Sequence, residues 1–174
     1  MRVQSLYVGS AGTGYFGAYS SYRRSGIMTH PEGFHHATQI TVRFADLDAL
    51  GHLNHAKYLT YAEHARIVYI AEVCGWNSQA GDGWKHFGII LARAECDYKL
   101  PVAFGDRVTV WTRISRLGGK SFDFEYVLMR HREGEADAIC ATAKTVMVAY
   151  DYIAETTIAI PDEWRQRIQT YEGL

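Results

Sequence analysis

The 174-residue sequence predicts one α+β domain in which a long antiparallel sheet wraps around one central helix. Apolar residues recur at helical spacing over residues 55–74, and four long stretches of alternating or β-branched residues follow between residues 86 and 152. The connections between these stretches are short and contain Gly or Asp. Strands joined in this way pair antiparallel, because a parallel pair needs a crossover of a dozen residues or more. No internal repeat and no second domain is evident.

The first 35 residues differ in composition from the rest. The segment VGSAGTGYFGAYSSYRRSG is rich in Gly, Ser and Tyr and has neither helical nor strand periodicity. Such a segment buries too little apolar surface to offset its ordering entropy. We therefore expect residues 1–35 to be a flexible N-terminal extension and residues 36–171 to be the folded domain. Met28 leads into the ordered pattern, so a start at Met28, with residues 1–27 as an upstream extension, is a further hypothesis.

The first expected elements are a strand and a helix. Ile40, Val42 and Phe44 alternate with polar residues, as in a strand with one buried face. A turn-like ADLDALGH follows, and then a helix that ends at Gly75, since glycine is favoured just past a helix C-terminus. The apolar spacing of the helix is carried by Leu59, Ala62, Ala65, Tyr69 and Val73. Its many alanine and β-branched residues leave little polar face, so we expect burial on most sides.

Four strands and a terminal helix complete the prediction. The strands are expected over residues 86–99, 106–117, 122–128 and 137–152. Small residues share one face of the first strand, which would let the helix approach closely, and Gly118-Gly119 predicts a turn between the second and third. Pro161 opens the terminal helix, with acidic residues in its first turn and arginines later, as the helix dipole favours.

The composition excludes several function classes. The formal net charge of −1 provides no basic field for nucleic-acid binding, so no nucleic-acid partner is expected. No apolar run approaches the roughly 20 residues that span a bilayer, and the N-terminus lacks a secretory signal pattern, so no membrane partner is expected. The three cysteines show no C-x-x-C spacing and lie in apolar segments. This favours buried thiols and a reducing, cytoplasmic location.

The segment VRFADLDALGHLNHAKYLTYAEHAR, residues 42–66, is the most informative about chemistry. It predicts a strand, an acidic turn that contains Asp48, and a helix start with Asn54 as the N-cap. The free amides that follow, beginning at His55, carry roughly half a positive charge. Such a helix start suits polarisation of a carbonyl oxygen, while a nearby carboxylate attacks the carbonyl or activates a water molecule.

The same segment resembles the signature of the 4-hydroxybenzoyl-CoA thioesterase family of hotdog-fold proteins. The signature combines D-x-D, a glycine and a helix with Y-x-x-x-x-E-x-A-R. The matching residues are Asp46, Asp48, Gly51, Tyr58, Glu63, Ala65 and Arg66. The GHLN turn is closest to the branch that acts on fatty or related acyl-CoA esters, and the resemblance covers about residues 38–165. It implies a hotdog fold and hydrolysis of an acyl-CoA thioester.

The resemblance also implies roles for individual residues. Asp48 is the expected catalytic carboxylate, as nucleophile or general base, and the His55 amide is expected to polarise the thioester carbonyl. Lys120 and Ser121, in the turn RLGGKSF, are expected to bind the phosphates and nucleotide of CoA, with Arg116 as a weaker candidate. Two further substrate-binding residues are expected beside the catalytic pair, namely Asn54 and Tyr58.

Other residues have alternative interpretations. Asp46 is expected to hold the turn, and Glu63 to pair with Arg66 three residues later, with a catalytic role for Glu63 as the alternative. His52 and His55 have a spacing compatible with metal ligation. No third ligand is obvious and the family uses no metal, so neither a metal nor a cofactor is expected.

Rival functions and the assembly state complete the expectations. The D-x-x-P-x-H pattern of hotdog hydratases and the H-x-x-x-F-P-G-x-P pattern of dehydratases are missing. A non-catalytic acyl- or aryl-CoA binding module and a thioesterase for acyl carrier protein stay open. A homodimer or homotetramer is expected, because a single curved sheet exposes long edges. The acyl group is undetermined; the candidates for its pocket are Leu50, Leu53, Tyr58, Trp76, Trp84 and Phe87.

Overall fold

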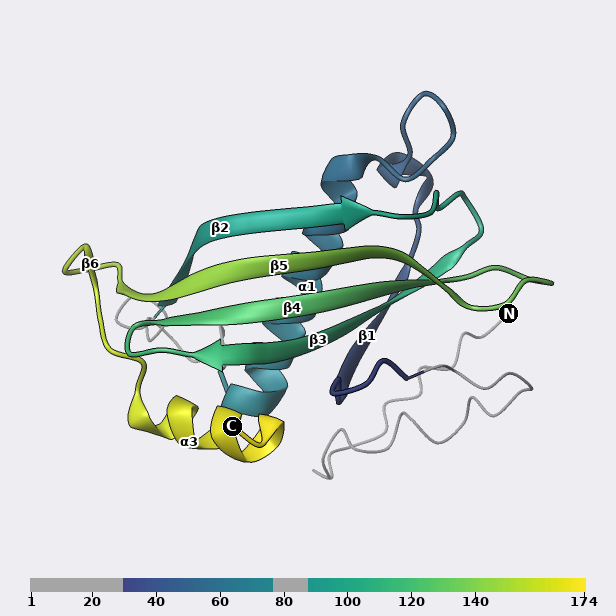
Figure 1. Ribbon diagram of the computed structural model, residues 1–174. Coiled ribbons are helices and arrows are strands. Elements are labelled where there is room, and N and C mark those ends of the chain that lie inside the picture. Colours follow the sequence, from purple (N-terminus) through teal and green to yellow (C-terminus); the bar gives the residue numbers. More distant parts are fainter. Residues whose placement is uncertain (1–29, 77–87) are drawn as a thin grey trace, which may run out of the picture.

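The computed structural model describes residues 30–76 and 88–174, and it confirms the predicted α+β class (Figure 1). The hypothesis on residues 1–27 and the pocket candidates Trp84 and Phe87 lie outside these ranges. The elements are β1 (His36–Thr41), a 3₁₀ turn (Phe44–Asp46), α1 (His55–Cys74), β2 (Gly88–Tyr98), β3 (Arg107–Leu117), β4 (Ser121–His131), β5 (Ala138–Asp151), β6 (Thr156–Thr157) and α3 (Asp162–Glu172).

The strands form one antiparallel sheet in the order β1-β3-β4-β5-β2, and the short β6 pairs with β5. The expected pairing of strands that short connections join is correct for β3, β4 and β5, which are neighbours in both sequence and space. It is wrong for β2, which crosses to the far edge and pairs with β5 (Figure 1). The crossover brings the end of β2 beside the start of α1, and this position creates the site described below.

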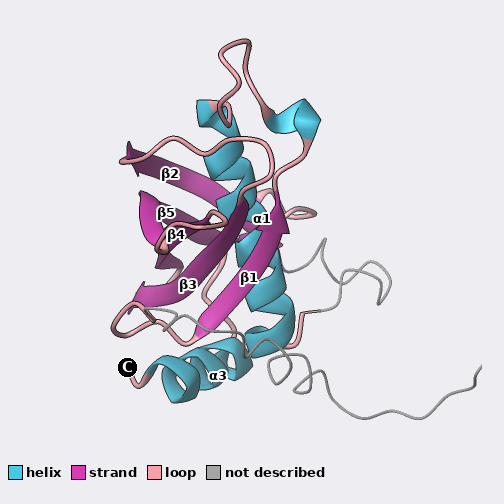
Figure 2. Cartoon of the chain, turned by 90° about the vertical axis from the view of Figure 1, so that its right-hand side faces the viewer, coloured by secondary structure: helices cyan, strands magenta, loops and turns pink. Residues whose placement is uncertain are grey.

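Helix α1 lies across one face of the sheet and contacts β1, β2, β3 and β5 (Figure 2). The aromatic residues of β4 fill the core between them, and Ala62 and Ala65 of α1 have no exposed surface, which allows close packing. The other side of α1 carries Glu63 and His64, both exposed, and Ile67 is 38% exposed. The expected burial of α1 on most sides is therefore not met in a single chain.

The boundary between β1 and α1 differs from the expected strand. Val42 is buried as predicted, but Phe44 is 80% exposed, because the chain turns into the 3₁₀ segment after Thr41. The cause is local: the carboxylate of Asp46 accepts a hydrogen bond from the backbone amide of Arg43 at 3.1 Å. The turn ends the alternation of buried and exposed side chains before Phe44, which was expected to belong to the strand. It directs the chain toward α1.

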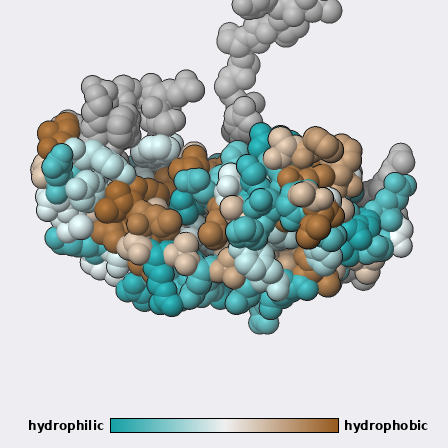
Figure 3. All heavy atoms as spheres, turned by 90° about the horizontal axis from the view of Figure 1, so that it is seen from above, coloured by the Kyte–Doolittle hydropathy of each residue, from teal (hydrophilic) through white to brown (hydrophobic). Residues whose placement is uncertain are grey.

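Large hydrophobic side chains also reach the surface. Seen from above, hydrophobic areas are separated by hydrophilic ones (Figure 3). The exposed residues nearest the start of α1 and the end of β2 are Phe44, Leu50, Tyr98, Leu100 and Phe104. Within residues 30–76 and 88–174, no helix is long and apolar enough to cross a membrane.

Candidate active site

The acidic loop before α1 holds the carboxylate of Asp48 in a fixed position. Its Oδ1 atom accepts hydrogen bonds from the amides of Leu50 at 2.9 Å and His52 at 3.2 Å. The Asp48 amide donates to the His52 carbonyl at 2.8 Å, and Gly51 closes the turn at φ +80°, a conformation that favours glycine. No described residue donates to Oδ2. One carboxylate oxygen is thus anchored, and the other is available to a reactant.

The start of α1 supplies a free donor beside this loop. The Asn54 side chain accepts from the Ala56 amide at 3.0 Å, which confirms Asn54 as the N-cap, and its carbonyl accepts from the Lys57 amide at 2.8 Å. The His55 amide has no hydrogen-bond partner in the described parts of the chain. The Tyr98 hydroxyl donates to the His55 carbonyl at 3.1 Å and ties the end of β2 to the first turn of the helix.

The loop, the helix start and the end of β2 border an open cavity of about 320 Å³. Its lining residues are Asp48, His52, Leu53, His55, Tyr58, Tyr98, Lys99, Leu100 and Pro101. The structure therefore brings the predicted Asp48, His55 and Tyr58 together, while Asn54 caps the helix next to them. Asp48, with its unpaired Oδ2 atom, and His55, with its unpaired amide, therefore both line one space large enough for the reacting part of a substrate.

The contribution of β2 was missed by sequence reasoning. Tyr98, the last residue of β2, is 49% exposed and lines the cavity. The rings of Tyr58 and Tyr98 meet edge to face with centroids 5.1 Å apart. Burial raises the pKa of Tyr58 to about 12, so its hydroxyl stays protonated at neutral pH. No local sequence signal marks Tyr98, because its role depends on the crossover of β2.

Lys120 and Ser121 lie far from Asp48 in the same chain. The Lys120 ammonium group donates to the carbonyl of Thr157 at 3.0 Å. Ser121 is level with Val148 of β5, and Val148 is level with Ile90 of β2. Tyr98 lies eight residues beyond Ile90, a distance of roughly 26 Å at ~3.3 Å per residue. One chain does not bring the predicted phosphate-binding residues to the cavity.

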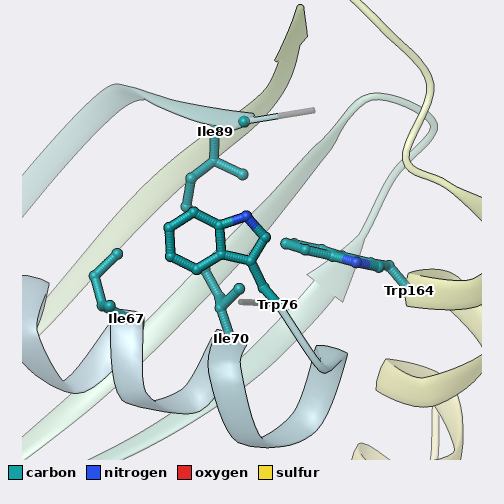
Figure 4. Close-up of a pocket in the computed structure, with 6 residues that line it drawn as sticks. Ile67, Ile70, Trp76, Ile89 and Trp164 are labelled. Atoms are coloured by element: carbon teal, nitrogen blue, oxygen red, sulfur yellow. The ribbon is translucent and has the colours of Figure 1, made fainter. Parts of the chain in front are cut away.

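A second cavity lies at the other end of α1. It measures about 20 Å³, and its wall includes Ile67, Ile70, Trp76, Ile89 and Trp164 (Figure 4). An apolar space that holds about one water molecule is too small for an acyl group. Trp76 lines this cavity rather than the one at Asp48, and Leu50 is 81% exposed, so two of the proposed pocket residues lie elsewhere.

The acidic helix residue Glu63 does not line the cavity at Asp48. Its side chain is 65% exposed and lies 3.6 Å from the guanidinium group of Arg66, which matches the expected pairing. In the described ranges, no three His, Cys, Asp or Glu side chains gather closely enough to hold a metal ion. The geometry favours Asp48 over Glu63 as the reactive carboxylate.

The sequence and the fold are similar to those of known proteins. The sequence matches the thioesterase-like superfamily over residues 42–168. It is 26% identical to the long-chain acyl-CoA thioesterase FadM of Escherichia coli (strain K12) over 135 residues, which are 76% of this chain and 96% of that protein. A Thermus thermophilus thioesterase in complex with coenzyme A and Zn is 35% identical, with a TM-score of 0.67, and the match covers 82% of this chain and 98% of that one.

A third similar structure is a 4-hydroxybenzoyl CoA thioesterase mutant in complex with 4-hydroxybenzoyl CoA. It has a TM-score of 0.69 over 76% of this chain and 96% of that chain. Its identity of 18% shows that the fold is shared. The antiparallel sheet around α1 is thus the expected hotdog fold.

Proposed function

The chain belongs to the thioesterase-like superfamily, and on this premise we propose that it hydrolyses an acyl-CoA thioester to the free acid and CoA. The observation that carries the proposal is that Asp48 and His55 line the same cavity, and that no described group pairs with Oδ2 of Asp48 or with the His55 amide. The names of two relatives support the substrate class, since one is a long-chain acyl-CoA thioesterase and the other is a thioesterase in complex with coenzyme A.

In the proposed reaction, the thioester carbonyl oxygen accepts a hydrogen bond from the His55 amide. The free Oδ2 atom of Asp48 attacks the carbonyl carbon, or it removes a proton from a water molecule that attacks instead. The carbon–sulfur bond breaks and CoA leaves as a thiolate. In the first route a mixed anhydride with Asp48 remains, and water hydrolyses it to the free acid. In the second route the free acid forms directly, and the proton taken by Asp48 passes to the thiolate. Thiolate is a competent leaving group, so the cavity needs no strong general acid.

The position of the His55 amide gives it a large share of the catalysis. A donor aimed at a developing oxyanion is worth about 2.7–4 kcal/mol in acyl-transfer enzymes. The amide is preorganised here, because Asn54 caps the helix through the next amide and Tyr98 holds the His55 carbonyl. The helix dipole adds to the favourable interaction with negative charge.

The CoA end of the substrate requires a second copy of the chain. Strand β2 has one paired edge and one open edge. An antiparallel pair of two β2 strands centred on Ala94 would place Tyr98 of one copy level with Ile90 of the other. Lys120 of the second copy would then lie about three strand spacings away, roughly 14 Å at ~4.8 Å each. The proposal is therefore a homodimer, or a tetramer built from it, whose Lys120 and Ser121 bind the phosphates of the opposite site.

The test measures thiol release from short, long and aromatic acyl-CoA esters by the wild type, Asp48→Asn and the control Asp162→Asn, whose carboxylate is exposed on α3. We expect Asp48→Asn to lower kcat at least about 100-fold, the lower bound for losing a general base, with the fold retained. The control should match the wild type.

Other outcomes point to the alternatives. Activity that survives in Asp48→Asn would refute the role of Asp48. Hydrolysis of acyl carrier protein thioesters, but not of CoA thioesters, would show that the substrate is carried by acyl carrier protein. CoA binding without turnover of any thioester would favour a non-catalytic binding module.

A further inference from the structure

We propose that Asp46 is a positioning residue, which holds the Asp48 loop and the first turn of α1 in the register that the reaction needs. The inference rests on the proposed function and adds a residue that does not touch the cavity. Asp46 has no exposed surface and is not among the residues that line the cavity. Its effect on the reaction is therefore exerted through other groups.

The Asp46 carboxylate is the centre of a dense set of hydrogen bonds. Oδ2 accepts from the Arg43 amide at 3.1 Å and from Arg43 Nε at 3.0 Å, and Oδ1 accepts from Arg43 Nη2 at 2.8 Å. The hydroxyl of Tyr61, in the second turn of α1, donates to Oδ2 at 3.0 Å, and Lys57 Nζ lies 3.6 Å from Oδ1. A fully buried carboxylate is tolerated only with such partners. Two of them belong to α1, so the side chain fixes the 3₁₀ turn against the helix.

The backbone of Asp46 fixes the other end of the loop. Its carbonyl accepts from the Asn54 amide at 2.9 Å, and the next residues bridge as Leu47 with Leu53. The two reactive groups follow directly from this junction, since Asp48 comes two residues after Asp46, and His55 comes one residue after Asn54. A movement of Asp46 relative to α1 would therefore change the separation between the attacking oxygen and the oxyanion donor.

The chain offers a matched control in Asp106. This aspartate is also buried, at 4% exposure, and it accepts from the amide three residues earlier, Ala103, at 2.8 Å. Arg132 donates to it through Nε at 2.7 Å and Nη2 at 2.8 Å, as Arg43 does to Asp46. The described bonds of the Asp106 side chain are all with these two residues, and neither lies in α1. Asp106 reaches the Asp48 loop only indirectly, through the bridge between Ala103 and His52. The pair therefore separates loss of a buried aspartate near this loop from loss of the direct link to α1.

The experiment compares Asp46→Asn, Tyr61→Phe and Asp106→Asn in the full-length protein. We expect Asp46→Asn to lower kcat roughly 100-fold with KM for acyl-CoA changed less than about threefold, since a displacement of about 1 Å costs a factor of that order. Tyr61→Phe, which removes one neutral donor, should lower kcat between about threefold and tenfold. Asp106→Asn should lower the melting temperature but leave kcat within about threefold.

Amide hydrogen exchange gives a readout that does not depend on turnover. In Asp46→Asn, the amides of Asn54 and Ala56, which are hydrogen-bonded in the wild type, should exchange at least about tenfold faster, with the β4 amides unchanged. Equal loss of kcat in Asp46→Asn and Asp106→Asn would overturn the inference, as would unchanged exchange at the helix start. If Asp46→Asn does not fold, Tyr61→Phe decides by the same two readouts. If the wild type hydrolyses no thioester, the proposed function fails, and the exchange data still decide on the role of Asp46.

Discussion

Replacement of Asn54 separates the structural from the electrostatic role of the helix start. The Asn54 side chain caps the Ala56 amide at 3.0 Å and leaves the His55 amide free of any described partner. Asn54→Ala removes the cap, whereas Asn54→Asp keeps an oxygen in the same place and adds a negative charge. Asn and Asp are about equally good N-cap residues. Asn54→Ala therefore removes the cap without adding charge, and Asn54→Asp adds a charge without removing the cap.

The expected magnitudes follow from this geometry. Loss of the cap in Asn54→Ala should lower the free energy of unfolding by about 1 kcal/mol. In a protein of this size, that corresponds to a decrease of about 2–4 °C in Tm. Asn54→Asp should unfold like the wild type. Its added charge, about 4 Å from a developing oxyanion, opposes the transition state by roughly 1 kcal/mol in water and roughly 4 kcal/mol at an effective dielectric constant of 20. We therefore expect kcat to fall at least about fivefold.

Two measurements check the prediction. Denaturant unfolding gives the free energy and m-value of each variant, and thiol release at saturating acyl-CoA gives kcat at low and high salt. The loss in Asn54→Asp should shrink at high salt, because the charge is partly exposed and screened. Full activity of Asn54→Asp with an intact fold would refute the reasoning, since it would mean that negative charge does not develop at the start of α1.

Three further predictions follow. Gly75→Ala should lower the free energy of unfolding by about 1–2 kcal/mol, because Gly75 has φ +71° and an added Cβ would lie 2.5 Å from the Arg167 guanidinium. Denaturant unfolding measures the change, and Gly119→Ala, with open space around the added Cβ, is the control. Hydrogen bonds from the neighbouring Arg43 hold the pKa of Asp46 below its usual value. The ionised Asp46 therefore stabilises the fold above about pH 4, and this contribution is lost as the pH falls. The free energy of unfolding of Asp46→Asn should decrease less steeply between about pH 5 and pH 2 than that of the wild type. Lys120→Ala should raise KM for acyl-CoA with kcat unchanged and leave hydrolysis of a short pantetheine thioester unaffected; equal losses for both substrates would contradict phosphate binding.

The helix and its ends were predictable because their signals are local. The limits of α1, the cap at Asn54 and the termination at Gly75 depend on the chemistry of a few neighbouring residues. The same is true of the Asp48 turn, where Gly51 supplies a positive φ that few other residues adopt. Phe44 was misplaced because the bond from the Arg43 amide to Asp46 overrides the alternation of the strand.

The sequence by itself determined the α+β class, the limits of α1, the approximate positions of β2 to β5, and two of the proposed reactive groups, Asp48 and His55, because all of these depend on spacing and on neighbours within a few residues. Only the tertiary structure decided the position of β2, since pairing of β2 with β5 rather than β3 depends on contacts about 50 residues apart in sequence. That pairing brings Tyr98 to the His55 carbonyl and completes the lining of the cavity. It also leaves Lys120 roughly 26 Å along the sheet from the site, at ~3.3 Å per strand residue, so the proposed binding of the CoA phosphates by Lys120 would need a second chain.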